Sequence, residues 1–291
     1  MIKQIFIVCL LLLVAGCSVL PNQVPLTNKT KSSYSKINTI SVVVQDEVIP
    51  KVKPSNVSGV VGGGLIAAMV DSSITGSRMN EALYTLEPFY WEVEDHDFRP
   101  IIEKKLKAKL ASNKQFDFSS FELTNRYISN DAQKRIMYQL DSSEALMIIG
   151  VSYNFSMFFK TLDISSSVSI WKKGDPTPDS LIYLQKINVQ SPYIGSGGED
   201  SVELWSANNA KIYKENIELL TTELAATINN FTTHDYKSFQ GEEVVVRFHN
   251  GQKDLPIKGK IINKSNSRVT LLAQDNVIYN LPFIEMKIKL L

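Results

Sequence analysis

The residues best suited to metal or acid–base chemistry are the three histidines, His96, His234 and His249. His96 lies in the segment EDHDF, where the carboxylates of Glu94, Asp95 and Asp97 could join its imidazole as ligands. Adjacent residues point to different sides, however, and no second histidine follows four residues later, as a zinc-binding helix requires. We interpret EDHDF as a solvated turn before a helix, and we predict neither a metal site nor a catalytic residue.

Motifs for nucleophilic catalysis and phosphate binding are absent from the sequence. No serine stands in a G-x-S-x-G motif. Residues 62–64 and 195–198 are rich in glycine, but neither run matches G-x-G-x-x-G or a G-K-[ST] phosphate loop. Glu199 and Asp200 follow the second run, and their charge would repel a phosphate. We therefore predict that the protein is not an enzyme and uses no cofactor.

The first residues have the layout of an export signal. Lys3 is positively charged, residues 5–14 are apolar without interruption, and Ala15 and Gly16 are small. This order is typical of a secretory signal peptide. Ten apolar residues are too few for a transmembrane helix, which needs about 20. We predict that residues 1–16 are a signal peptide that is removed.

Cys17 follows this segment, and the junction Val-Ala-Gly-Cys at residues 14–17 resembles the lipobox of bacterial lipoproteins. The resemblance implies a diacylglycerol on the Cys17 thiol and a third acyl chain, such as palmitate, on the new amino terminus. Several acyl chains on one residue exceed the two signals that stable anchoring requires. In such lipoproteins an aspartate after the cysteine favours the inner membrane. Because Ser18 stands here, we expect a lipid anchor in the outer membrane and a domain facing the periplasm. An ordinary signal peptide followed by an incidental cysteine is the alternative.

Composition limits what the mature chain could bind. Removal of 16 residues from 291 leaves 275, with 30 basic and 30 acidic side chains, a balance that argues against nucleic-acid binding. Cys9 would be lost with the signal peptide, so the mature protein would have no disulfide and no sulfur ligand for a metal. Its stability must then come from a hydrophobic core, which 44% apolar residues can supply.

A glycine-rich segment, residues 57–76, is the one place where the sequence indicates a contact surface. Gly59, Gly63, Gly64 and Ala68 are spaced so that another backbone could approach a helix closely. The apolar run is about 14 residues, which is shorter than a membrane-spanning helix. Three interpretations stay open: a buried helix packed on its own sheet, an interface with a partner or second copy, and membrane insertion. The first is our working prediction.

Residues 37–233 are predicted to form an α/β domain, and residues 17–36, with few large apolar groups, a flexible tether before it. The predicted strands are 40–44, a long one from residue 145, and a hairpin of 162–171 with 181–189. The predicted helices are residues 98–110, one capped by Asn130, and one of about 30 residues from Glu199. The apolar residues of the last helix step by threes and fours with one gap, at Asn209.

The remaining residues, 241–291, are predicted to form five short strands with turns at 250–251, 264–266 and 275–276. The segments EVVVRFHNG, IKGKIIN and LPFIEMKI resemble the strands of SH3-like or Sm-like barrels. The resemblance implies a small closed β-barrel domain, which hides its strand edges.

The order of elements in residues 37–233, together with the anchor, resembles periplasmic lipoproteins whose α/β domain is like the amino-terminal domain of the Tol translocation protein or the curli secretion lipoprotein. The expected fold class is α+β: an α/β sandwich with a mixed sheet and a long packing helix, then the small barrel. The expected function is a non-catalytic binding, scaffold or assembly factor of the cell envelope, with an envelope protein or another copy of the chain as partner. The alternatives are a subunit of an oligomeric outer-membrane secretion channel and an envelope enzyme.

Overall fold

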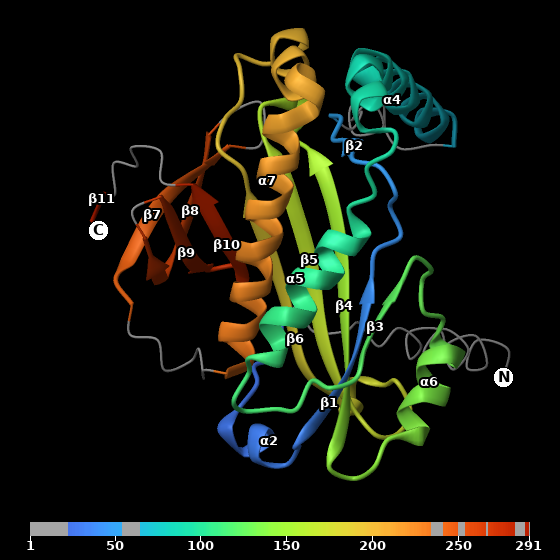
Figure 1. Ribbon diagram of the computed structural model, residues 1–291, viewed down its shortest axis with the longest axis vertical. Helices are drawn as coiled ribbons and strands as arrows, with labels where there is room; N and C mark the ends of the chain where they lie inside the picture. The colour runs from blue at the N-terminus through green and yellow to red at the C-terminus, as the bar shows by residue number, and fades with distance from the viewer. Residues whose placement is uncertain are drawn as a thin grey trace, which may run out of the picture.

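The computed structural model describes residues 23–53, 65–233, 241–249, 254–265, 267–282 and 289–290. The predicted signal peptide, Cys17, Gly59, Gly63 and Gly64 lie outside these residues. Within the described part of the chain, the strands form one mixed sheet of eleven strands (Figure 1). Their order is β11-β7-β8-β9-β10-β6-β5-β4-β1-β3, and β2 pairs with β4.

Three long antiparallel strands form the centre of this sheet: β4 (Glu144–Phe155), β5 (Leu162–Lys172) and β6 (Leu181–Gln190). Beyond β4, the strands β1 (Lys36–Val42), β3 (Phe121–Thr124) and the short β2 (Ile49–Pro50) pair in parallel. The predicted β5–β6 hairpin and the long strand from residue 145 are confirmed. The sheet is mixed, as predicted.

Helices α5 (Arg99–Ala111) and α7 (Glu199–Thr233) cover one face of the sheet (Figure 1). In α5 the buried residues are Ile102, Leu106 and Leu110, so its spacing of four residues turns one stripe to the core. In α7 both Trp205 and Leu220 are completely buried, which confirms the predicted long packing helix. These helices and the sheet enclose the main hydrophobic core.

Helix α7 is interrupted at residues 207–210, where the backbone leaves helical geometry. Asn208, Asn209 and Ala210 have positive φ angles of 50–59°, a region that asparagine enters more readily than most residues. The interruption coincides with the gap that the apolar spacing shows at Asn209. The gap in the apolar spacing therefore lies at the irregular turn, but it did not predict that the helix is kinked there.

Helix α6 (Asn130–Gln139) packs on the opposite face of the sheet. Ser129 caps it, because its side chain accepts a hydrogen bond from the amide of Ala132 at 3.2 Å. The predicted cap, Asn130, is instead the first helical residue. Met137 is buried with Trp171 in a second, smaller cluster of apolar side chains.

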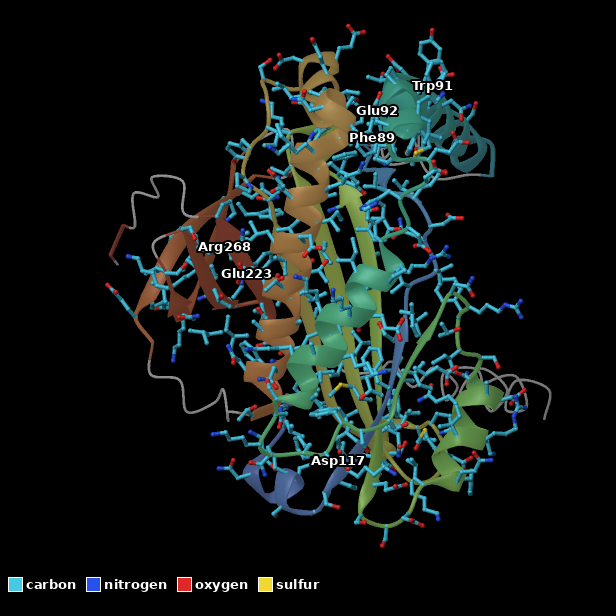
Figure 2. All side chains as sticks on the ribbon, viewed as in Figure 1. Phe89, Trp91, Glu92, Asp117, Glu223 and Arg268 are labelled. Carbon is cyan, nitrogen blue, oxygen red and sulfur yellow. The ribbon has the colours of Figure 1, made fainter. Side chains whose placement is uncertain are left out.

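Helix α4 (Leu65–Val93) continues well beyond the glycine-rich segment and contains Ala68. Its second half was not predicted, because Pro88 lies inside the helix and interrupts a simple helical pattern. Leu86, Phe89 and Val93 join the main core, whereas Trp91 is 74% exposed (Figure 2). The C-terminal part of the helix is thus anchored in the main core.

The prediction of a flexible tether over residues 17–36 is wrong from Gln23 onward. Val24 exchanges two backbone hydrogen bonds, of 3.0 and 2.9 Å, with Leu184 of β6, and Leu26 is 1% exposed in the main core. Helix α2 (Asn28–Ser32) follows, and Lys31 donates a 2.8 Å hydrogen bond to the carbonyl of Thr233 at the end of α7. Two well-placed apolar residues are enough to dock a segment whose average composition is polar.

The C-terminal residues form the five predicted strands: β7 (Glu243–His249), β8 (Asp254–Lys264), β9 (Arg268–Ala273), β10 (Val277–Pro282) and β11 (Lys289–Leu290). They make an antiparallel meander with β11 returning to β7. The predicted turn at 275–276 is present, with Asn276 at a φ of 64°. The described residues do not show the predicted separate barrel, because β10 pairs in parallel with β6 and continues the main sheet.

A buried arginine ties these strands to the rest of the fold. Arg268 is 5% exposed and donates hydrogen bonds of 2.8 Å to the carbonyls of Gln190 and Asn280. The amide of Asn280 donates in turn to Glu223 of α7 at 2.9 Å. Figure 2 shows Arg268 and Glu223 beside one another, between the C-terminal strands and α7. The sequence offered no signal for this junction.

Candidate binding groove

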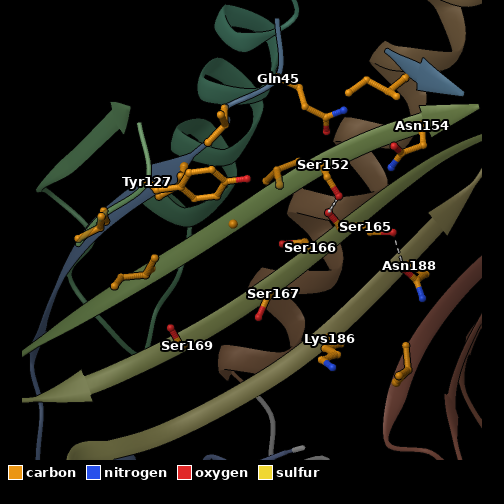
Figure 3. A pocket seen from close by; sticks show the side chains of 18 of the residues that line it. Gln45, Tyr127, Ser152, Asn154, Ser165, Ser166, Ser167, Ser169, Lys186 and Asn188 are labelled. Carbon is orange, nitrogen blue, oxygen red and sulfur yellow. Dashed lines mark hydrogen bonds between the residues drawn. The ribbon is translucent and has the colours of Figure 1, made fainter. Parts of the chain in front are cut away.

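A groove of about 770 Å³ lies on the face of the sheet opposite α5 and α7, beyond the part that α6 covers (Figure 3). Ligand pockets in proteins have volumes of about 300–1,000 Å³. The floor is made of small or polar side chains on β4, β5 and β6: Gly150, Ser152, Asn154, Ser165, Ser167, Ser169, Lys186 and Asn188. We call this hollow the groove.

Strand register arranges the floor in rows across the sheet. In one row Ser167 of β5 lies between Gly150 of β4 and Lys186 of β6. In the next row Ser165 lies between Ser152 and Asn188. Paired residues on neighbouring strands point to the same face, so each row presents its groups together.

The hollow exists because the central positions are small. Gly150 has no side chain, and a Cβ placed there would meet nothing closer than the carbonyl oxygen of Ser167 at 3.8 Å, an ordinary contact. Packing within the sheet therefore does not demand glycine at this position. A glycine inside a strand weakens it and often marks close approach by a ligand or another backbone.

The serine hydroxyls are only partly used within the protein. Ser165 donates a 2.7 Å hydrogen bond to the amide oxygen of Asn188, and Ser169 accepts one of 2.8 Å from the indole nitrogen of Trp171. Since a hydroxyl can donate and accept at once, Ser169 retains its own hydrogen for another acceptor. Ser167 is exposed, and its hydroxyl has no partner among the described residues.

Lys186 supplies the only charge among the described residues that line the groove. Its side chain is exposed and forms no ion pair with any described carboxylate. The nearest acidic residue along β5, Asp163, is 4% exposed and already engaged. Its carboxylate accepts hydrogen bonds of 2.8 Å from both Lys51 and Gln190. The floor of the groove is therefore neutral apart from one ammonium group.

The rim combines apolar side chains with one exposed aromatic ring. The segment between β1 and β2 contributes Val44 and Gln45, and Gln45 is held by two hydrogen bonds with the backbone of Tyr153, of 3.1 and 3.3 Å. Tyr127, from the loop between β3 and α6, is 84% exposed. Figure 3 shows its ring at the mouth of the groove, with the hydroxyl directed towards Ser152.

The histidine singled out from the sequence lies elsewhere. His96 follows α4 and packs its ring edge-on against Phe98, with ring centres 4.9 Å apart. Burial, and next the positive charge of Lys214, lower the pKa of His96 below its ordinary value. Asp97 does not face it as a ligand would, because its carboxylate binds Arg99 at 2.9 Å. In the described ranges no three His, Cys, Asp or Glu residues come close enough to hold a metal ion.

The other candidate residues are not brought together by the described structure. Cys17, Gly59, Gly63 and Gly64 lie outside it, and Ala68 lies in α4, none of whose described residues lines the groove. The groove itself was missed, although β5 carried its signal. In LDISSSVSIW the apolar residues Ile164, Val168 and Ile170 alternate with Ser165, Ser167 and Ser169, which marks a strand with one apolar face and one hydroxyl face.

Comparison of the chain with protein-family models and with curated proteins finds no match. Among the helices of the described residues, none has both the length and the apolar character needed to cross a bilayer.

Proposed function

We propose that this protein is a non-catalytic binding protein of the bacterial cell envelope, anchored by acyl chains on Cys17, with the groove as its ligand site. The observation that carries the proposal is the groove itself. It presents uncharged hydroxyl and amide groups and one ammonium on rigid central strands, but no pair of acid and base. Such a surface can recognise a ligand through hydrogen bonds and one charge-assisted contact.

The anchor would hold the domain close to the membrane. Only five residues lie between Cys17 and Gln23, where the docked segment begins, so six residue-to-residue steps join the two. At about 3.5 Å per residue, the chain reaches about 20 Å at most. The proposed location is the outer membrane, facing the periplasm, because Ser18 follows the cysteine. In this arrangement the protein is an accessory or scaffold factor that presents its ligand near the bilayer.

We also propose that residues 241–291 close into a small SH3-like barrel attached to the sheet. The order β11-β7-β8-β9-β10 and the return of β11 to β7 are compatible with such closure. These strands also share a core of their own, which includes Val244, Val246 and Leu271.

A subunit of an oligomeric secretion channel is the second candidate, and the surface of α4 favours it. Tyr84 and Trp91 are 78% and 74% exposed and lie seven residues apart, on one side of the helix. A second copy of the chain could cover this aromatic face. Crosslinking of the membrane-bound protein into rings, lost on changing Tyr84 and Trp91 to serine, would favour the channel over the accessory factor.

The anchor is tested by labelling cells with radioactive palmitate. The natural protein should incorporate label and sediment with membranes, whereas Cys17→Ser should incorporate none and accumulate as precursor. Ser18→Asp, which leaves the thiol in place, should still be labelled but move to the inner membrane. Label entering the Cys17→Ser protein would exclude the proposed attachment.

The groove is tested with two matched substitutions. Gly150→Leu places a side chain in the centre of the floor without a backbone clash, and Gly76→Leu adds the same atoms on α4, where a Cβ meets nothing within 4 Å. Both proteins should melt at or above the natural temperature, since replacing glycine favours helix and strand. After purification in detergent from membranes, Gly150→Leu alone should lose the co-purifying ligand. Equal recovery from both variants would exclude the groove as the site.

A further inference from the structure

The chemistry of the groove narrows the class of ligand, and this inference rests on the groove being the binding site proposed above. Its floor offers groups that both donate and accept hydrogen bonds. Ser167 has an unused hydroxyl, Ser169 has an unused hydrogen, and Asn154 extends the polar row on β4. Polar groups of this kind disfavour a hydrocarbon chain, because covering them without hydrogen bonds costs free energy. They match a ligand that is itself rich in hydroxyl and amide groups.

The charge of the groove sets a second condition. Lys186 is the sole ionised group among the lining residues that the structure describes, so a ligand with one negative charge would find one ion-pair partner there. A metal ion or polyamine would find no carboxylate in the described part of the lining, which has neither aspartate nor glutamate. A nucleic acid or polyphosphate needs several cations along its path, and the lining provides one.

The rim sets a third condition. Tyr127 offers an exposed ring at the mouth of the groove, where a flat and partly apolar surface of the ligand could rest (Figure 3). Val42 and Val277 extend the apolar boundary on the two sides of the row that contains Ser167 and Lys186. The ligand therefore has polar groups on its edge and an apolar face, as a pyranose ring does.

Recognition of an extended peptide through its backbone is not available on the floor. That mode requires an unpaired strand edge. Within the floor, β4 is paired with β1 and β5, β5 with β4 and β6, and β6 with β5 and β10. The ligand must be recognised by side chains.

We propose that the groove binds a saccharide that carries a single carboxylate. The hydroxyl and amide groups of the sugar form hydrogen bonds with the serines and Asn154. The carboxylate pairs with Lys186, and one face of the sugar ring rests against Tyr127. A cell-wall disaccharide whose lactyl carboxylate is free, and not joined to a peptide by an amide, has this chemistry, and the proposed periplasmic location would expose the groove to it.

The test uses the full-length protein in detergent and two probes that differ only in charge. The probes are the disaccharide of N-acetylglucosamine and N-acetylmuramic acid, and the methyl ester of the same disaccharide. By titration calorimetry the natural protein and Gly76→Leu should bind the acid about tenfold more tightly than the ester, or better, because a charge-assisted hydrogen bond is lost in the ester. Lys186→Gln should bind both probes equally, at the affinity of the ester. Gly150→Leu should bind neither.

Three results would overturn the inference. If the natural protein bound the acid and the ester with equal affinity, Lys186 would not pair with the carboxylate of the ligand. Binding of the peptide acetyl-alanyl-alanine as tightly as the disaccharide would assign the groove to peptide carboxylates. Absence of disaccharide binding up to about 10 mM, with Gly150→Leu still losing the co-purifying ligand, would refute the saccharide while the binding function stands. If Gly150→Leu retains its co-purifying ligand, the proposed function itself fails.

Discussion

Arg268, on β9, donates a 2.8 Å hydrogen bond to the carbonyl oxygen of Gln190, the last residue of β6. This contact spans 78 residues and crosses the join between the C-terminal strands and the central sheet. Burial lowers the pKa of Arg268 to about 10, and the negative charge of Glu223 opposes that shift. The guanidinium thus donates to carbonyl and amide oxygens in place of water, and these buried oxygens would lose a hydrogen-bond donor without it.

Replacement of Arg268 should therefore destabilise the protein. Arg268→Met leaves the carbonyls of Gln190 and Asn280 without this donor and removes the buried cation that the charge of Glu223 favours, so we expect a loss of about 3 kcal/mol in the free energy of unfolding. Lys260→Met, an exposed position on β8, should change it by less than about 0.5 kcal/mol. Urea denaturation measures both. A loss from Arg268→Met as small as that of the control would show that the junction contributes little.

The C-terminal strands should still fold without the rest of the chain. A fragment of residues 241–291 keeps its own core of Val244, Val246 and Leu271, and in the fragment Arg268 can be solvated by water. We expect an all-β circular dichroism spectrum and a cooperative melt, at a lower temperature than in the full chain because pairing with β6 is lost. A helical spectrum, or a gradual loss of signal without a transition, would contradict an autonomous unit.

Two consecutive leucines on α7 provide a matched test of its packing. Leu220 is completely buried, whereas Leu219 is 40% exposed. Leu220→Ala should lower the free energy of unfolding by about 2–5 kcal/mol, because it removes buried methyl groups and leaves a cavity. Leu219→Ala should cost less than about 1 kcal/mol. Similar values for the two, measured by denaturant unfolding, would mean that the buried face of α7 is misassigned.

Stability should decrease on mild acidification because of His96. Its folded-state pKa lies below 6.5, owing first to burial and then to Lys214, while Asp97 and Glu218 act in the opposite direction. A lowered pKa means that the folded protein binds this proton less readily than the unfolded chain. The contribution is therefore fully present above about pH 6.5 and is lost as the pH falls through the folded pKa.

The measurement is the free energy of unfolding between pH 7 and about pH 5, for the natural protein and for His96→Gln, which cannot titrate. The difference between the two proteins isolates His96 from His234 and His249. We expect the natural protein to lose more stability over this range. Parallel curves would show that His96 has the same pKa in the folded and unfolded states.

Local patterns predicted the elements of this fold better than their pairing. The spacing of Ile102, Leu106 and Leu110 was sufficient for α5, because a helix turns every fourth residue to the same side. The alternation in residues 162–171 was sufficient for β5. The docking of Leu26 and the pairing of β10 with β6 could not be predicted in the same way, because each depends on a distant surface that the local sequence does not contain.

By itself, the sequence determined most of the helices and strands, although not α2, β3 or the second half of α4. It also determined which faces of the predicted elements are apolar, and that no recognised catalytic motif is present. Those properties follow from the order of neighbouring side chains and from backbone geometry, which repeat over two to four residues. Only the tertiary structure decided that Gly150, Ser167 and Lys186 lie in one row, and that Arg268 meets Gln190 and Glu223. Strand register and the parallel join of β10 to β6 place these residues together, and both are set by long-range packing.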